Sequence, residues 1–224
     1  PLLGGHRGAN RLATKISEAL GAVSAVTTAG DVALGVALDE PPLGYALQNP
    51  DDAKDVMARL LSGGGVTWEG EAIFDADLPA GNDVALCVTE APEQGGSDRL
   101  IYHPQRFTLG LGCARNADPE AMWQHVSETL RVHGIAAGAI ACVASIDLKA
   151  DEPAIIAIAA RLGVPLRVFT AAALEAETAR LATPSDVVFA EVGCHGVSEG
   201  AALAAAGPDA ELVVVKHKTD EATC

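Results

Sequence analysis

Short apolar runs alternate with amphipathic stretches through the second half of the chain. The runs that predict strands are residues 107–111, 139–143, 165–169, 187–192 and 212–216. The stretches with helical spacing are residues 118–134, 152–162, 171–181 and 197–206. Because strands alternate with helices of about ten or more residues, we expect a mostly parallel sheet with flanking helices. Residues 106–224 are thus predicted to form a three-layer α/β domain.

The helix expected after residue 117 has clear boundary signals. Asp118 is a helix-capping residue, Pro119 fits the first turn, and Gly134 is suited to the C-terminal end. Its apolar stripe consists of Met122, Val126 and Leu130. This stripe is expected to face the sheet.

A smaller α/β pattern opens the chain, in residues 1–38. Leu2 and Leu3 resemble the end of a strand, and a glycine-rich turn follows at residues 4–8. A helix is then predicted, with Leu12, Ile16, Ala19 and Leu20 on one face and Gly21 at its end. Residues 23–28 predict another strand. Because the chain starts on apolar residues without an initiator methionine, we expect a fragment of a longer protein with a partial N-terminal α/β region.

The middle part, residues 39–105, is predicted to be a linker or small α+β region. Asn49 and Pro50 mark a helix start, and three consecutive glycines at residues 63–65 mark its end. Short strands are expected at residues 66–69, 84–89 and 99–103. The polar loop at residues 91–98 predicts a hairpin between the last two strands.

Composition excludes several classes of partner. Thirty acidic residues face fifteen basic ones, which gives a net charge of −15, so nucleic acid and anionic membranes are poor candidates. No apolar run reaches the ~20 residues of a membrane span. The five cysteines are dispersed and form no CxxC pair, which favours a reducing cytoplasm over a disulfide scaffold. The sequence leaves the oligomeric state open.

The first glycine turn is a candidate anion site. Gly4, Gly5 and Gly8 allow close approach of the backbone to a ligand, and the following helix N-terminus favours a carboxylate. His6 can transfer protons near neutral pH, and Arg7 adds positive charge. The alternative is a tight strand–helix turn, capped by Asn10, with Arg7 in solvent.

The second turn, residues 110–115, begins like a dinucleotide-binding loop. It carries Gly112, but Arg115 stands where the third glycine of GxGxxG belongs, and no acidic residue follows at ribose-binding distance. Arg115 is better suited to binding a substrate carboxylate through two parallel hydrogen bonds from its guanidinium group. Cys113 is interpreted as a small buried hydrophobe.

The third turn, residues 193–199, holds two candidate bases. His195 or Glu199 could activate a water molecule. The alternative is structural, with Ser198 capping a helix and Glu199 interacting with its dipole. Cys194 is a weaker nucleophile candidate, because sequence neighbours rarely meet in triad geometry.

The loop at residues 146–153 supplies Lys149, placed either to pair with Glu152 or to hold an anionic substrate. Asp151 is the expected cap of the helix that follows. No histidine pair has the spacing of a metal site, so no protein-bound metal is expected.

Several motifs in fixed order resemble the cobalt-precorrin-5A hydrolase family (CbiG) of cobalamin biosynthesis. They are PLLGGHRGANRLA with VTT in residues 1–28, and GLGCARNADPEA, IDLKADEPAI, GVSEGAALAAAG and VKHKTDEATC in residues 107–224. The second group is also similar to the free-standing protein CobE. Residues 1–38 thus resemble the remainder of the family's N-terminal domain, and residues 106–224 its C-terminal domain.

The resemblance implies a hydrolase that opens the ring-A lactone of cobalt-precorrin-5A and releases acetaldehyde. Cobalt would arrive in the substrate, so no cofactor is expected. Combined with residue chemistry, it leads us to expect His6, Glu199 or His195 as base and the amides of residues 4–8 as oxyanion donors. The expected contacts to the carboxylate arms are Arg7, Arg115, Lys149 and Lys216.

Two other functions stay open. One is a non-catalytic, CobE-like module that binds a corrinoid intermediate, fused to or partnering a precorrin methyltransferase. The other is a general α/β anion-binding domain.

Overall fold

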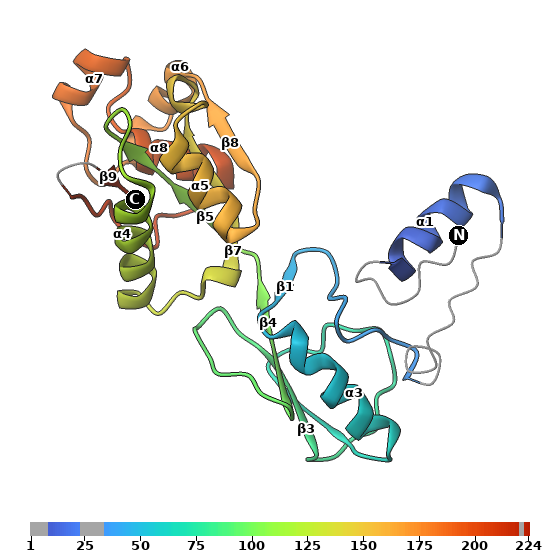
Figure 1. Ribbon diagram of the computed structural model, residues 1–224. Helices are drawn as coiled ribbons and strands as arrows, with labels where there is room; N and C mark the ends of the chain where they lie inside the picture. The colour runs from blue at the N-terminus through green and yellow to red at the C-terminus, as the bar shows by residue number, and fades with distance from the viewer. Residues whose placement is uncertain (1–8, 23–33, 220–221) are drawn as a thin grey trace. The chain divides into compact units, whose positions relative to one another are not determined.

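A computed structural model describes residues 9–22, 34–219 and 222–224, with the side chains of residues 9–11 and 14 left out. The chain divides into two compact units (Figure 1). The first contains the described residues up to Thr89 together with Glu93–Pro104. The second consists of Glu90–Pro92 and Gln105–Cys224.

The first unit contains a four-stranded sheet in the order β1-β4-β3-β2. Its elements are α1 (Ala9–Leu20), β1 (Tyr45–Leu47), η1 (Pro50–Asp52), α3 (Ala53–Leu61), β2 (Val66–Glu69), β3 (Val84–Val88) and β4 (Arg99–Pro104). The predicted end of α1 at Gly21 is confirmed, because this residue has a left-handed φ of 61°. The predicted strand at residues 23–28 lies outside the described residues.

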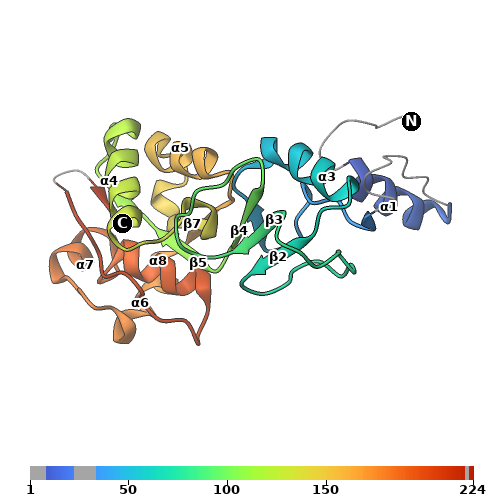
Figure 2. The ribbon, with the colours of Figure 1, turned by 90° about the horizontal axis from the view of Figure 1, so that it is seen from below.

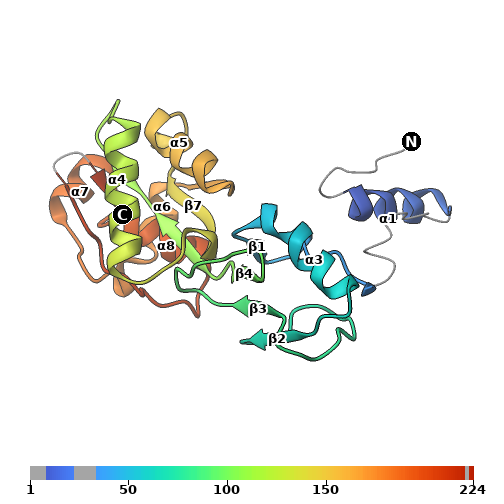
Figure 3. The same ribbon diagram turned by 60° about the horizontal axis from the view of Figure 1, so that its bottom comes forward.

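The predicted hairpin between β3 and β4 is wrong, because these strands pair in parallel. Figure 3 shows the arrows of β2 and β3 pointing the same way, and these strands are also parallel. The loop at residues 89–98 therefore returns along the strand instead of turning tightly. Asn49 holds the returning chain: its amide donates to the carbonyl oxygen of Arg99 and accepts from the N–H of Ile101. Gly95 fits against it, since a Cβ there would lie 2.3 Å from the Asn49 Nδ2.

The second unit is a three-layer α/β domain, as predicted. Its parallel sheet has the order β5-β7-β8, and Figure 2 shows α4 and α5 on one face with α8 and α6 on the other. Small strands β6 (Gly112–Cys113) and β9 (Ala222–Thr223) pair antiparallel. The larger elements are β5 (Phe107–Gly110), α4 (Pro119–Val132), β7 (Ile140–Ile146), α5 (Pro153–Leu162), β8 (Leu166–Phe169), α6 (Ala171–Glu175), α7 (Asp186–Val192) and α8 (Val197–Ala206). Three 3-10 turns complete it: η2 (Ala137–Ala139), η3 (Asp147–Lys149) and η4 (Thr178–Arg180).

The boundaries of α4 follow the sequence signals. The Asp118 carboxylate accepts from the N–H groups of Glu120 and Ala121, which caps the helix as predicted. The predicted stripe of Met122, Val126 and Leu130 is buried. With the apolar residues of α5 and the sheet, it forms the larger of the two cores in this unit.

On the opposite face α8 lies directly on β5. A Cβ at Gly110 would lie 1.8 Å from the carbonyl oxygen of Ser198, so only glycine permits this approach. One turn further on, the Thr108 hydroxyl donates to the carbonyl oxygen of Ala202 at 2.9 Å. These contacts show that α8 runs antiparallel to β5 and begins at the carboxyl end of that strand.

Two strand predictions in this unit are wrong. Residues 187–192 form helix α7, because the Ser185 hydroxyl accepts from the N–H of Val188 and so starts a helix despite the β-branched residues. Residues 212–216 form no strand. The helix predicted at residues 171–181 is shorter, since α6 ends at Glu175 and η4 follows. Ser198 does not cap α8; Gly196 occupies the cap position.

Among the helices of the described ranges, none has the length and hydrophobicity needed to span a membrane.

Candidate functional site

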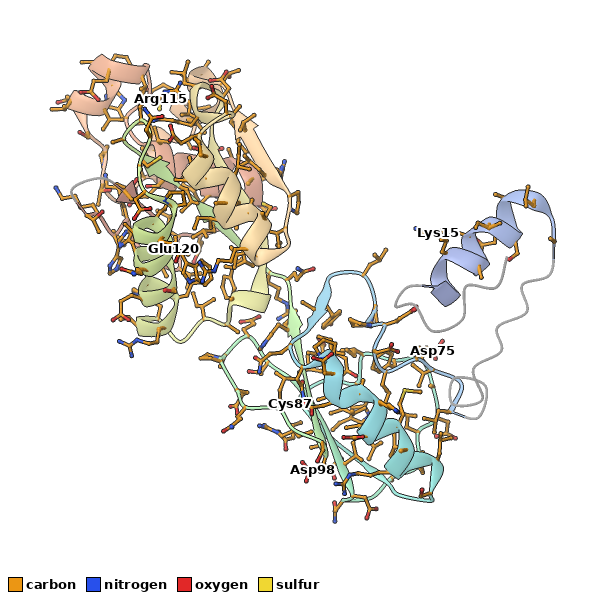
Figure 4. All side chains as sticks on the ribbon, in the orientation of Figure 1. Lys15, Asp75, Cys87, Asp98, Arg115 and Glu120 are labelled. Carbon is orange, nitrogen blue, oxygen red and sulfur yellow. The ribbon has the colours of Figure 1, made fainter. Side chains whose placement is uncertain are left out.

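The candidate site lies at the carboxyl edge of the second unit's sheet. In open parallel sheets ligands bind beyond this edge. The chain leaves β5, β7 and β8 here, and α8 begins here. The N-terminus of α8 is close to the loop after β5, because a Cβ at Gly112 would lie 3.7 Å from the Val197 Cγ1. Figure 4 shows Arg115 at the same end of the unit as α6 and α7.

His195 and Glu175 form a dyad at this edge. Both carboxylate oxygens of Glu175 lie 2.9 Å from the His195 Nδ1, and Oε2 also accepts the backbone N–H of His195 at 3.0 Å. The N–H of Ser185 donates to the carbonyl oxygen of His195 at 2.8 Å. The imidazole is therefore fixed through both its ring and its main chain.

The dyad has the chemistry of a general base. The hydrogen bond from His195 holds the pKa of Glu175 below its usual range, so this carboxylate is charged and only accepts. Nδ1 of His195 must therefore carry a proton, which leaves Nε2 as the basic nitrogen of the neutral ring. The side chain of His195 is 24% exposed, so this nitrogen is within reach of water.

Two residues of α7 lie beside the imidazole. The ring of Phe189 stacks on that of His195, with 4.5 Å between centroids and 25° between planes. The carboxylate of Asp186 lies 3.5 Å from Nε2 and is itself fully exposed. Because Asp186 is free to rotate into solvent, it can leave Nε2 open to a substrate or a water molecule.

Sequence reasoning missed Glu175. Residues 171–181 were expected to form one helix, which would have placed Glu175 in its middle without a function. The helix instead ends at Glu175, and the chain brings His195 to it twenty residues later. Spacing alone carries no signal for such a pair, because neither helical nor strand periodicity joins residues this far apart.

Glu199, the other base candidate within the described residues, is held in a different way. Its carboxylate is 4% exposed and accepts four hydrogen bonds, from the N–H groups of Ala182, Thr183 and Lys216 and from the Thr183 hydroxyl, at 2.9–3.0 Å. Burial favours the neutral acid, but these donors prevail and lower the pKa of Glu199 below its usual value. A carboxylate that already accepts four hydrogen bonds, and whose charged form is stabilised by them, is a weak base. The geometry gives Glu199 the role of a structural anchor.

Arg115 and Lys149 are brought together around one buried carboxylate. Lys149 Nζ lies 3.3 Å from Glu152 Oε2, and Arg115 Nη1 lies 3.7 Å from the same oxygen. The other oxygen of Glu152 accepts the N–H of Asn116 at 2.9 Å. The predicted Lys149–Glu152 pair is thus confirmed. Asp151, in contrast, caps no helix and pairs with Arg115 at 2.9 Å.

The four charges of this cluster balance. Arg115 and Lys149 face Asp151 and Glu152, so the cluster has no net positive charge. Its members differ in burial: the Glu152 side chain is 1% exposed, whereas Asp151 is 81% exposed. A substrate carboxylate could replace Asp151 on Arg115 without disturbing the buried part.

Comparison with known proteins places the chain in a family. Residues 107–224 match the family described as Cobalamin synthesis G C-terminus, and residues 1–31 match Cobalamin synthesis G N-terminal. The chain belongs to the cobalamin synthesis G family. Its resemblance to the hydrolase family and to CobE is thereby confirmed.

Two curated relatives and one solved structure define the similarity. Protein CobE from Sinorhizobium sp is 49% identical over 117 residues, which cover 52% of this chain and 76% of that protein. Cobalt-precorrin-5A hydrolase from Priestia megaterium is 26% identical over 250 residues, covering 99% of this chain and 66% of that protein. A crystal structure of CobE, described as a protein from the cobalamin (vitamin B12) biosynthetic pathway, matches with a TM-score of 0.50 and 35% identity. The match covers 54% of this chain and 87% of the CobE chain in that crystal structure.

The other expected site residues within the described ranges are Lys216, Gly112 and Asn10. Lys216 Nζ donates to the carbonyl oxygen of Thr183 at 3.2 Å, and no contact in the described residues joins Lys216 to Arg115 or Lys149. The Thr223 hydroxyl donates a hydrogen bond to the carbonyl oxygen of Gly112. Asn10 lies in α1, but its side chain is not described. The residues outside the described ranges are Gly4, Gly5, His6, Arg7 and Gly8.

Neither cysteine near the site has the properties of a nucleophile. Cys194 is fully buried, and burial raises the pKa of its thiol. Burial also raises the pKa of Cys113, despite the opposing effect of Lys149. Low thiolate content makes both unreactive. Over the described part of the chain, no group of three or more His, Cys, Asp or Glu side chains is arranged to hold a metal ion.

Proposed function

We propose that this chain is part of a hydrolase that opens the ring-A lactone of cobalt-precorrin-5A and releases acetaldehyde. Its family membership, and its similarity along 99% of its length to a cobalt-precorrin-5A hydrolase, support this assignment. The chain spans 66% of the length of that relative, so the activity is proposed for the longer protein. Cobalt belongs to the substrate and is not held by protein ligands.

The dyad of His195 and Glu175 is the observation that carries the proposal. Nε2 of His195 takes a proton from water as the water oxygen bonds to the lactone carbonyl carbon. The ring C–O bond then breaks, and the proton passes from Nε2 to the departing alkoxide oxygen. Glu175 stabilises the imidazolium that exists between these two steps. In the second step the carbon–carbon bond between the hydroxyl-bearing two-carbon group and the macrocycle breaks. The hydroxyl loses its proton as its oxygen becomes the carbonyl of acetaldehyde, and the electron pair of the broken bond stays on the macrocycle.

Arg115 and Lys149 are proposed to bind carboxylate arms of the substrate. Arg115 is 57% exposed, and its partner Asp151 is more exposed still, so this ion pair is exchangeable. The buried Glu152 keeps Lys149 in place while Arg115 changes partner. The amides of residues 4–8 and the side chain of His6 stay predictions, as oxyanion donors and as a second base.

The test compares two neighbouring residues in the full-length protein. With cobalt-precorrin-5A as substrate, His195→Gln is expected to lower the rate of acetaldehyde release by about 10²-fold or more, because general-base catalysis contributes roughly that much. Cys194→Ala, the matched control, should stay within about twofold of the wild type. Acetaldehyde release by His195→Gln at the wild-type rate would assign the base elsewhere.

The second candidate is a non-catalytic corrinoid-binding module that passes an intermediate to a precorrin methyltransferase. It is favoured by the match to CobE, which covers 52% of this chain and 76% of that protein. Here binding, seen as a change in the visible spectrum of the corrinoid, would occur without acetaldehyde. A spectrum unchanged with every corrinoid intermediate would leave only a general anion-binding domain.

We also propose a cytoplasmic location. All five cysteines are free thiols, which is typical of a reducing compartment. Cell fractionation with an antibody to the chain tests this assignment.

A further inference from the structure

Strand β5 forms one edge of the second unit's sheet. It pairs with β7 on one side, and within the described residues no strand pairs with its other side. An edge strand presents a row of N–H and C=O groups that can pair with another strand. The open side of β5 is therefore able to extend the sheet.

A cavity of about 280 Å³ lies beside this open edge. Its walls come from β5, from α4, from α8 and from residues 210–214. Since α4 and α8 cover opposite faces of the sheet, the cavity occupies the layer of the sheet itself, where a further strand would lie. Ser198 lines it, is 3% exposed, and has a hydroxyl without a hydrogen-bond partner among the described residues.

Residues 211–216 lie along this cavity with the burial pattern of a strand. Alternate residues are half-buried, namely Leu212, Val214 and Lys216, and those between them are exposed. Val213 is 65% exposed and Val215 is 47% exposed, although valine favours strands and burial. No backbone hydrogen bond between main-chain groups joins residues 211–215 to another described element. The segment thus has the pattern of a strand without its pairing.

Both ends of this segment are fixed in the orientation that pairing with β5 requires. At its start, the Arg180 guanidinium donates to the carbonyl oxygens of Gly207 and Ala210. At its end, the N–H of Lys216 donates to Glu199, in the first turn of α8 and so at the carboxyl end of β5. The segment therefore runs parallel to β5 after the antiparallel helix α8, which is the order of a βαβ crossover.

We propose that residues 211–216 close onto β5 as a fourth parallel strand that fills the cavity. Closure pairs the open edge of β5 and takes Val213 and Val215 out of water. It also brings main-chain groups into the cavity, where the unpaired Ser198 hydroxyl can bond to them. The two anchors, Arg180 and Glu199, stay in place during this movement.

Hydrogen exchange of the backbone amides, followed by NMR, tests the proposal on the full chain. Alternate amides of residues 211–216 are expected to exchange at least tenfold more slowly than unstructured amides, because in a parallel strand alternate N–H groups point at the partner. Exchange of all these amides at the unstructured rate would overturn the proposal. Amides of β7 serve as the control for intact folding.

Two neighbouring proline variants give the sharper comparison. Proline removes a backbone N–H. Of Val213→Pro and Val214→Pro, only the variant that removes an N–H pointing at β5 should abolish protection of the remaining amides. Equal loss in both variants, or no loss in either, would contradict a strand. The two substitutions are otherwise matched, since they are adjacent and remove the same residue type.

Filling the cavity is the independent test. Ala202→Phe places a ring from α8 into the space the strand needs, so protection of residues 211–216 should fall to the unstructured rate while β7 stays protected. Protection unchanged by this ring would overturn the proposal. So would uptake of xenon by the wild-type cavity together with unprotected amides, because the cavity would then be a permanent void.

Discussion

The carboxylate of Glu175 bonds to His195 twice, at Nδ1 of the ring and at the backbone N–H. This double contact fixes both the tautomer and the direction of the imidazole, which a single hydrogen bond would not.

Replacing Glu175 should lower the rate of the reaction. In Glu175→Gln the negative charge that stabilises the imidazolium between the two proton transfers is lost, so we expect kcat to fall by about 10²-fold. Glu175→Asp keeps the charge and should retain more of the rate. Steady-state rates of acetaldehyde release compare the two variants, and a wild-type rate in Glu175→Gln would remove Glu175 from the mechanism.

Glu199 should determine stability in acid. Its pKa is lowered in the folded state, so it stabilises the fold above the unfolded pKa of about 4.3, and this contribution is lost as the pH falls through the lower folded value. Glu199→Gln should cost about 1–3 kcal/mol of unfolding free energy at pH 7, because the amide turns a donor toward the N–H of Lys216. Urea unfolding at pH 7 and pH 3.5 measures both effects. The difference between variant and wild type should narrow at the lower pH, and a difference that widens there would contradict the assignment.

Removing Lys149 should leave the buried carboxylate of Glu152 short of a partner. We expect Lys149→Met to lower the unfolding free energy by about 2–3 kcal/mol. The control is Arg131→Met, which breaks an exposed pair with Glu128 and should cost less than about 0.5 kcal/mol. Urea unfolding curves of the two variants give the comparison. In the double variant Lys149→Met with Glu152→Gln, part of the loss should be recovered; a larger loss would show that the pair is not the cause.

Gly110 should tolerate no side chain. The Cβ of Gly110→Ala would overlap the carbonyl oxygen of Ser198 at 1.8 Å, so α8 must move away from β5. A loss of about 3 kcal/mol or more is expected, at the upper end of overpacking effects. Gly96→Ala is the matched change at an open position, where the nearest atom would be 3.8 Å away, and it should be nearly neutral. Thermal unfolding of both variants decides between a required glycine and a general cost of the added methyl group.

The elements with local signals were predicted well from the sequence. Asp118, Pro119 and Gly134 act on neighbouring backbone groups, so they define α4 without knowledge of the fold. The misassigned elements have competing local signals or depend on contacts between distant residues. Residues 187–192 have strand-forming side chains, but the Ser185 cap decides for a helix. The parallel pairing of β3 with β4 is accompanied by a hydrogen bond from Asn49 to Arg99, fifty residues further along the chain.

The site shows the same division. The presence of His195 at a helix entrance, and the pairing of Lys149 with Glu152 three residues later, follow from local sequence. Glu175 could not be found in this way, and the four donors that saturate Glu199 come from two separate segments. Whether His195 or Glu199 can act as a base depends on the groups that bond to each side chain, and those groups come together only in the folded chain.

The Asn49 side chain has a consequence for how the first unit folds. It bonds to main-chain groups of Arg99 and Ile101 in β4, so these two hydrogen bonds form only when the last strand of that unit is in place. Parallel pairing of β3 with β4 also needs the intervening loop to close before any contact rewards it. Both features raise the contact order of this unit. Its folding should therefore be slow and all-or-none, with no stable intermediate that lacks β4.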